Sequence, residues 1–162
     1  MAQEIERKFL VVGDGWKATA KRVHFRQGYL SIDPERTVRI RMAGERAYVT
    51  IKGLSVGISR LEFEYEIPLE DAVEMLETLS LEPVIDKHRS TIEFEGLQWE
   101  VDEFHGANEG LVVAEVELTS ADEAINLPLW VGEEVSGDPR YFNANLVVNP
   151  FMNWKELKSE DS

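Results

Sequence analysis

The sequence contains no cysteine and only three histidines, and it has no long run of apolar residues. The absence of cysteine excludes disulfides and thiolate metal sites, so any bound metal needs oxygen or imidazole ligands. Because 31 acidic residues accompany the three histidines, oxygen ligands and a hard cation are favoured. The opening MAQEIERKFLVV is charged from the start, which predicts neither a signal peptide nor a membrane span. We expect a cytoplasmic protein with no membrane partner.

Basic residues are also scarce, with 17 Lys and Arg and a formal net charge of −14. An acidic surface argues against nucleic-acid binding, which requires an exposed cationic face. A local cluster of Lys and Arg inside a cleft can still bind a small polyanion, and divalent cations can offset part of the repulsion. Small anionic ligands therefore stay open, whereas nucleic acid is excluded as a partner.

Linkers, repeats and low-complexity tracts are absent as well. The 162 residues are 43% apolar, which is enough for one hydrophobic core without cross-links. We expect a single domain over residues 1–156 and a flexible tail over residues 157–162.

Alternation of polar and apolar residues dominates the sequence and predicts eight strands. Turn residues such as Asp33-Pro34 and Glu95-Gly96 separate them, so most neighbours are expected to pair as antiparallel hairpins. The predicted strands cover residues 3–12, 23–32, 37–42, 47–52, 60–67, 84–94, 97–104 and 111–118.

Helical spacing of apolar residues appears in one stretch, residues 68–79, after a proline suited to a first helical turn. Weaker helical candidates are residues 14–20, a stretch opened by the capping pair Ser120 and Glu123, and residues 139–146. The predicted fold class is therefore α+β, with most of the chain in strands and a few packing helices.

One face of nearly every predicted strand is ionic, because side chains two residues apart share a face. The residues of this face are Glu4, Glu6, Lys8, Arg39, Arg41, Lys52, Glu62, Glu64, Lys87, Arg89, Glu100, Asp102, Glu115 and Glu117. An ordinary sheet with one solvated face explains any single strand. However, like charges side by side on one strand repel unless a counter-ion lies between them. The acidic pairs thus suggest cations and the basic pairs suggest an anion, which together describe a metal polyphosphate inside a tunnel.

The ordered motifs resemble the CYTH proteins, also called triphosphate tunnel metalloenzymes. An ExExK signature begins at Glu4 and is followed by RQGYL, VRIR, TIK, LEFEYEI, IDKHR, WEVDEF and AEVEL, in the order of that family. The resemblance covers nearly the whole chain. It implies an eight-stranded antiparallel β-barrel that forms a triphosphate tunnel, with helices packed outside.

By the same resemblance, a triphosphate and its metal ions occupy the tunnel. The implied substrate-binding residues are Lys8, Arg39, Arg41, Lys52, Lys87, Arg89 and Arg140. The implied ligands of one or two Mg²⁺ or Mn²⁺ ions are Glu4, Glu6, Glu62, Glu64, Asp102, Glu115 and Glu117. The donor types agree with this, since Arg and Lys suit phosphate and carboxylates suit magnesium. Relatives often carry a basic residue in the C-terminal helix, and within the corresponding residues 138–145 Arg140 is the only basic residue that could replace it.

Phosphoryl transfer needs positioning and charge neutralisation more than a covalent nucleophile. The predicted activity is metal-dependent hydrolysis of a triphosphate, with inorganic tripolyphosphate favoured over thiamine triphosphate or a nucleotide. Glu4, Glu6 and Lys87 are the predicted catalytic residues, and Lys87 is a general-base candidate if neighbouring cations depress its pKa. The chain is expected to be a monomer or a homodimer.

Three alternatives stay open. The first is an adenylate cyclase of the class IV type, which uses the same cage but needs an adenine pocket. The second is a non-catalytic module that binds polyphosphate, and the third is a purely structural ionic barrel. The scattered His24, His88 and His105 share no metal-ligand spacing and are expected to be surface or hydrogen-bonded residues.

Overall fold

The computed structural model describes residues 3–17 and 21–154. Its strands are β1 (Gln3–Val11), β2 (Lys21–Ser31), β3 (Arg36–Ala43), β4 (Arg46–Gly53), β5 (Ser59–Ile67), β6 (Ile85–Phe94), β7 (Leu97–Phe104), β8 (Val112–Glu117) and β9 (Val131–Glu134). Its helices are α1 (Leu69–Thr78) and α2 (Asn143–Val148), with short 3₁₀ helices η2 (Gly106–Asn108) and η3 (Pro139–Tyr141). None of the helices in this part of the chain is long and apolar enough to cross a bilayer.

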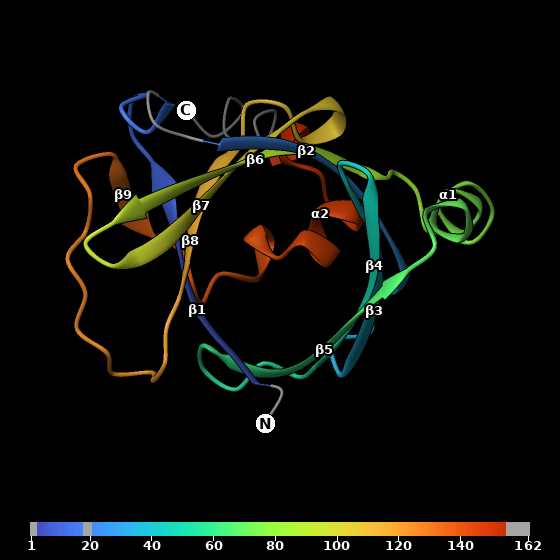
Figure 1. Ribbon diagram of the computed structural model, residues 1–162, viewed down its shortest axis with the longest axis horizontal. Helices are drawn as coiled ribbons and strands as arrows, with labels where there is room; N and C mark the ends of the chain where they lie inside the picture. Colours follow the sequence, from blue (N-terminus) through green and yellow to red (C-terminus); the bar gives the residue numbers. More distant parts are fainter. Residues whose placement is uncertain (1–2, 18–20, 155–162) are drawn as a thin grey trace.

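The strands form one antiparallel sheet that curls into a barrel (Figure 1). The order is β5-β4-β3-β2-β6-β7-β8-β1, and pairing of β1 with β5 closes the ring of eight. The predicted eight-stranded barrel is thus confirmed, and each predicted strand ends within two residues of the observed one. The hairpin between β6 and β7 turns on Glu95 and Gly96, both with positive φ, as a two-residue turn of type I′ requires.

The strand β1 is shared between two neighbours on one of its edges. Its first residues, Gln3 to Ile5, pair with β5, whereas Phe9 and Val11 pair with β9. The ninth strand therefore lies outside the closed ring (Figure 1). It was not predicted, because its four residues, VGEE, are too short and too polar to give a strand signal.

Apolar side chains cover the outer face of the barrel in two places. Helix α1 packs Ala72 and Leu76 against Ile40 and Ala47 of β3 and β4, and this confirms the helix predicted over residues 68–79. Close packing explains a glycine on β2, since a Cβ on Gly28 would lie 2.7 Å from the Cβ of Ser80.

The second outer cluster surrounds Trp99 on β7 and is covered by the segment between β8 and β9 through Ile125 and Trp130. The helix predicted from Ser120 is wrong, because the chain makes one turn there and then has no regular secondary structure as far as residue 128. The carboxylate of Glu123 reaches back to the N–H and Oγ1 of Thr119, at 2.7 and 2.8 Å, instead of capping a helix.

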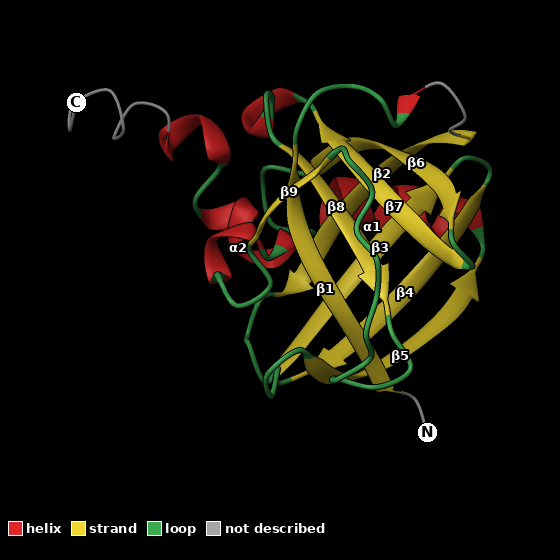
Figure 2. Ribbon diagram, turned by 90° about the vertical axis from the view of Figure 1, so that its left-hand side faces the viewer, coloured by secondary structure: helices red, strands yellow, loops and turns green. Residues whose placement is uncertain are grey.

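The C-terminal elements lie across one end of the barrel (Figures 1 and 2). Tyr141 of η3 and Leu146 of α2 are buried against Ile85 and Phe104 there. The helix predicted over residues 139–146 exists but is broken at Phe142, whose backbone is extended, into η3 and α2. Of the helix predicted over residues 14–20, residues 14–17 form a turn and the rest lies outside the described residues, as does the predicted tail.

Candidate active site

The barrel contains a cavity of about 520 Å³ whose wall carries many charged side chains. Residues on all eight barrel strands line it, since alternate side chains of each strand face inward. The basic lining residues are Lys8, Arg39, Arg41, Lys52, Arg60 and Arg89. The acidic lining residues are Glu4, Glu6, Glu62, Glu64, Glu100, Glu115 and Glu117.

The register of the sheet places cations opposite carboxylates around this cavity. Lys8 lies opposite Glu115 on the β1–β8 pair, with 3.3 Å between Nζ and Oε1. On the β4–β5 pair, Lys52 lies opposite Glu62 at 3.2 Å. Directly opposed residues of antiparallel strands share a face, so the ladder itself assembles these pairs.

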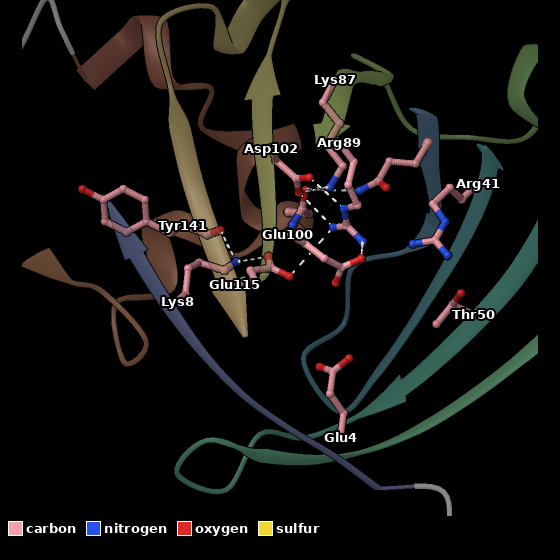
Figure 3. A network of polar contacts seen from close by, with 12 residues as sticks. Glu4, Lys8, Arg41, Thr50, Lys87, Arg89, Glu100, Asp102, Glu115 and Tyr141 are labelled. Atoms are coloured by element: carbon pink, nitrogen blue, oxygen red, sulfur yellow. Dashed lines mark hydrogen bonds and ion pairs between the residues drawn. The ribbon is translucent and has the colours of Figure 1, made fainter. Parts of the chain in front are cut away.

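The most deeply buried ion pair joins β6 and β7 (Figure 3). Asp102 accepts hydrogen bonds from Arg89, at 2.8 and 2.9 Å, and from Lys87 Nζ, at 2.8 Å. Lys87 also donates to Asn143 Oδ1 of α2, at 3.2 Å, and Asn143 accepts from Gln27 Nε2 at the same distance. The network therefore ties the helix at the barrel end to three strands.

Burial affects the pKa of both residues of this ion pair, Lys87 and Asp102. Burial lowers the pKa of Lys87 to about 8, and the charge of Arg89 adds to the effect although Asp102 opposes it. Burial alone would raise the pKa of Asp102, but Arg89 and Lys87 hold it well below its usual range. The Asp102 carboxylate is therefore ionised, and it keeps the Arg89 guanidinium aligned toward the cavity.

A second wall carries two arginines that share one carboxylate. Glu64 Oε1 lies 3.0 Å from Arg41 and 3.5 Å from Arg39, and it accepts a hydrogen bond from Thr50. Burial and the charges of Arg39 and Arg89 lower the pKa of Arg41 to about 10. The wall thus contains more positive charge than its single carboxylate balances.

Negative charge accumulates where β1 meets β5. Glu4 and Glu62 share a hydrogen bond beside Lys52. Although burial alone would raise the pKa of Glu4, the hydrogen bond from Glu62 and the charge of Lys52 lower it to about 2. Burial, that hydrogen bond and the charge of Glu4 raise the pKa of Glu62 to about 7.

Two further carboxylates extend this acidic region. Burial and the charges of Glu115 and Glu4 raise the pKa of Glu6 well above its usual range, and burial with Glu4 and Glu100 raises that of Glu117. The four carboxylates of Glu4, Glu6, Glu62 and Glu117 have too few neighbouring cations to be ionised together without a cost. We call these four the acidic cluster.

Comparison with known proteins agrees with this fold and cavity. The CYTH domain family model matches residues 2–147. The chain belongs to the CYTH domain family. An inorganic triphosphatase of Acetivibrio thermocellus is 54% identical over 156 residues, covering 96% of this chain and 100% of that protein. An inorganic triphosphatase of Nitrosomonas europaea is 36% identical, covering 90% and 97%. A crystal structure of an inorganic triphosphatase superposes with a TM-score of 0.65 at 33% identity, covering 89% of this chain and 97% of that one.

The acidic cluster of this CYTH domain fits a divalent cation by donor type and by charge. Its donors are all carboxylate oxygens, which suit Mg²⁺ and Mn²⁺. Three of its four pKa values are raised, which is the sign of negative charge that a cation would relieve. Across residues 3–17 and 21–154, no three acidic or histidine side chains already surround one ion position. The carboxylates would therefore turn toward an ion from their present partners.

The predicted site residues fall into three groups in this CYTH domain. Most line the cavity, namely Glu4, Glu6, Lys8, Arg39, Arg41, Lys52, Glu62, Glu64, Arg89, Glu115 and Glu117. Lys87 and Asp102 lie behind that lining, each with a side chain 1% exposed. Arg140 lies at the surface, where it pairs with Asp138 at 2.7 Å and packs over Trp154.

Several lining residues of this CYTH domain were not predicted as site residues. Glu100 shares a strand face with Asp102 and contacts Arg89 at 3.1 Å, so its spacing was a usable signal. Arg60 lies opposite Glu4 on the β1–β5 pair, at the start of β5. Asn143 of α2 carried no sequence signal, because only the folding of the C-terminal segment back over the barrel end brings it to the cavity.

Proposed function

We propose that this protein is an inorganic triphosphatase that hydrolyses tripolyphosphate to diphosphate and phosphate inside the barrel, with Mg²⁺ or Mn²⁺, in the cytoplasm. The observation that carries the proposal is the division of the cavity wall. The acidic cluster lies on one side of the cavity, where β1 meets β5. Five basic side chains also line the cavity, namely Lys8, Arg39, Arg41, Lys52 and Arg89. The names of the two relatives with which it shares nearly its whole length support the same activity.

In this proposal the carboxylates that now pair with the cations stand where phosphate oxygens bind. Glu64 holds Arg39 and Arg41, and Glu115 lies within reach of Lys8 and Arg89. A triphosphate carries more negative charge than these carboxylates and presents several oxygens to each guanidinium fork. Binding therefore exchanges internal ion pairs for stronger contacts to phosphate.

The acidic cluster would hold the metal ion, which when bound supplies neutralisation of phosphate charge and orientation of a water. Glu62 would release its shared proton to become a ligand beside Glu4 and Glu6. Arg41 and Arg39 would bind the end of the triphosphate opposite this cluster, since Glu64 now occupies that position. The triphosphate would thus lie between the wall that carries Arg39 and Arg41 and the acidic cluster where β1 meets β5.

The burial of Lys87 supports a positioning role more than direct proton transfer. Its amine is separated from the cavity by Asn143 and Arg89, to which it is linked directly and through Asp102. We propose that Lys87 fixes Asp102, and through it the guanidinium of Arg89. Replacing Lys87 by Met would then lower kcat but leave the shape of the pH profile unchanged, whereas loss of a general base would remove the rise in kcat that accompanies deprotonation of that base.

Phosphate release from tripolyphosphate, thiamine triphosphate, ATP and diphosphate tests the function. We expect tripolyphosphate to be hydrolysed fastest, with either Mg²⁺ or Mn²⁺, and EDTA to abolish turnover. The Glu4→Gln/Glu6→Gln double variant, matched in size, should lose activity while it keeps the fold. A cyclase would be indicated if ATP gave cyclic AMP and no substrate released phosphate. Tight binding with neither product would indicate a binding module.

A further inference from the structure

All three histidines of the chain lie together on the outer face of the barrel, although they are far apart in sequence. His24 of β2 and His88 of β6 are directly opposed in the sheet register, and their rings stack with centroids 4.7 Å apart. His105 follows β7, and its ring centroid lies 4.9 Å from that of His88. The side chains next to His88 along β6, Lys87 and Arg89, belong to the interior, so the histidine cluster is separate from the cavity.

The hydrogen bond between two of these rings favours the form of imidazole that binds metals. His88 Nδ1 lies 2.7 Å from His105 Nε2. One of these nitrogens must donate and the other must accept, so at least one ring is neutral. Burial and the nearby charge of Arg22 also lower the pKa of His88.

A carboxylate orients the third ring. His24 Nε2 lies 2.8 Å from Asp86 Oδ1, and the backbone N–H of His105 donates to the carbonyl oxygen of Asp86 at 2.9 Å. A carboxylate on one imidazole nitrogen fixes the tautomer and leaves the other nitrogen, here Nδ1, able to coordinate a metal. Asp86 therefore connects His24 on β2 with the segment that carries His105.

Solvent and charge both permit a cation here. The side chains of His24 and Asp86 are 45% and 41% exposed, so an ion can reach them from solution. Arg22 forms an ion pair of 3.1 Å with Glu103, so its positive charge is balanced. Glu103 lies on β7, directly opposite His88 in the register. The remaining basic neighbour, Arg26, is opposed to Asp86 in the register.

We propose that His24, His88 and His105 form a binding site for a divalent transition metal such as Zn²⁺ or Ni²⁺, distinct from the Mg²⁺ or Mn²⁺ of the proposed active site. The ion would replace the proton shared by His88 and His105, and that proton would move to the other nitrogen of the donor ring. Both rings then bind as neutral imidazoles. Imidazole selects zinc and nickel, whereas carboxylates select magnesium and manganese, so the two sites differ in metal preference.

The rings of His88 and His105 need only small movements to reach this arrangement, whereas the ring of His24, which now stacks on that of His88, must also turn to aim its Nδ1 at the ion. In tetrahedral coordination with bonds of about 2.0–2.1 Å, two ligand nitrogens lie about 3.3 Å apart. The present separation of 2.7 Å between His88 and His105 must therefore open by a few tenths of an ångström. Their nitrogens are now paired in hydrogen bonds, which agrees with the absence, in the described ranges, of three donors around one point. A bound ion would link β2, β6 and the end of β7, so it should stabilise the barrel.

Calorimetric titration of the full chain with Zn²⁺, and separately with Ni²⁺, tests this site in a large excess of Mg²⁺. We expect one high-affinity Zn²⁺ per chain and a rise in Tm on zinc binding. The Glu4→Gln/Glu6→Gln variant, altered only in the cavity, should retain both effects. His88→Gln and His105→Gln, made singly, should each weaken zinc binding by at least about tenfold, and the triple variant in which each histidine is replaced by Gln should abolish it.

The metal-free Tm of each variant shows whether it has folded, and a folded single variant is sufficient for the test. Zinc affinity that is the same in the histidine variants as in the unmodified protein would overturn the proposal, as would the absence of zinc binding to the unmodified protein. Zinc binding that is lost only in the cavity variant would assign the ion to the acidic cluster and would also overturn it. Triphosphatase activity is a separate readout, so failure of either proposal leaves the other intact.

Discussion

The hydrogen bond between Glu4 and Glu62 makes stability depend on pH where β1 meets β5. In the metal-free protein the pKa of Glu62 is raised to about 7 by burial and by Glu4. The folded state therefore binds more protons at this residue than the unfolded state between pH 4.5, the ordinary pKa of a glutamate, and about pH 7. Stability must then fall as the pH rises through that window, by at most about 3 kcal/mol from this group.

We predict that Glu62→Gln reduces this pH dependence, because glutamine cannot lose a proton. The measurement is the free energy of unfolding in urea, from pH 4.5 to 7, in EDTA. Glu66→Gln, an exposed glutamate on the same strand, is the matched control and should keep the slope of the unmodified protein. A Glu62→Gln protein with an unchanged slope would contradict the shared proton.

Asn143 connects the C-terminal helix to the cavity, where it accepts hydrogen bonds from Lys87 and Gln27. We predict that Asn143→Ala lowers kcat at least about tenfold, because Lys87 and Gln27 lose a common acceptor and the wall loses its fixed geometry. Asn145→Ala is the control on the same helix, since Asn145 also lines the cavity but its side chain, among the described residues, hydrogen-bonds only to the carbonyl oxygen of Pro139. Steady-state kinetics with tripolyphosphate would measure both variants, and equal effects would contradict the special role of Asn143.

At the scale of elements, helix α1 packs on the barrel through Ala72 and Leu76, which lie against apolar residues of β3 and β4. We predict that Gly28→Ala destabilises the protein by about 1–3 kcal/mol, because the new Cβ meets Ser80 at 2.7 Å and Leu76 at 2.9 Å. Gly137→Ala is the matched control, since a Cβ there has no neighbour within 4 Å. Urea denaturation would compare the two variants, and kcat should be unchanged in both. Equal stabilities would show that α1 shifts freely on the sheet.

Alternation along each strand predicted the barrel and most of its ionic interior, because period-2 patterning is a local property of the sequence. How deeply a side chain is buried is not a local property of the sequence. Lys87 and Arg89 share a strand face, but of the two only Arg89 lines the cavity. Lys87 lies at the end of the barrel that η3 and α2 cover. The histidine cluster was equally invisible, because only the register of β2 on β6 and the turn after β7 bring positions 24, 88 and 105 together. Sequence thus predicts which residues share a face but not what covers that face.

At the scale of the whole molecule, the barrel closes at its weakest seam beside its acidic cluster. Three residue pairs join β1 to β5, from Gln3 to Ile5, whereas eight join β6 to β7. Across this seam Lys52 contacts Glu4 on one side, at 3.1 Å, and Glu62 on the other, at 3.2 Å. A ligand held by the acidic cluster and the cationic wall therefore also holds the two edges of the sheet together.

We predict that Mg²⁺ with tripolyphosphate slows amide hydrogen exchange most at this seam, in the amides of residues 3–5 and 59–61. The β6–β7 hairpin serves as the internal reference, because its ladder is complete without a ligand. Hydrogen-exchange mass spectrometry at early times, with a non-hydrolysable triphosphate analogue, would measure the difference. The Glu4→Gln/Glu6→Gln variant should lose the protection at the seam. Uniform slowing over both regions would mean instead that the ligand stabilises a barrel already closed as one unit, and that the seam does not open on its own.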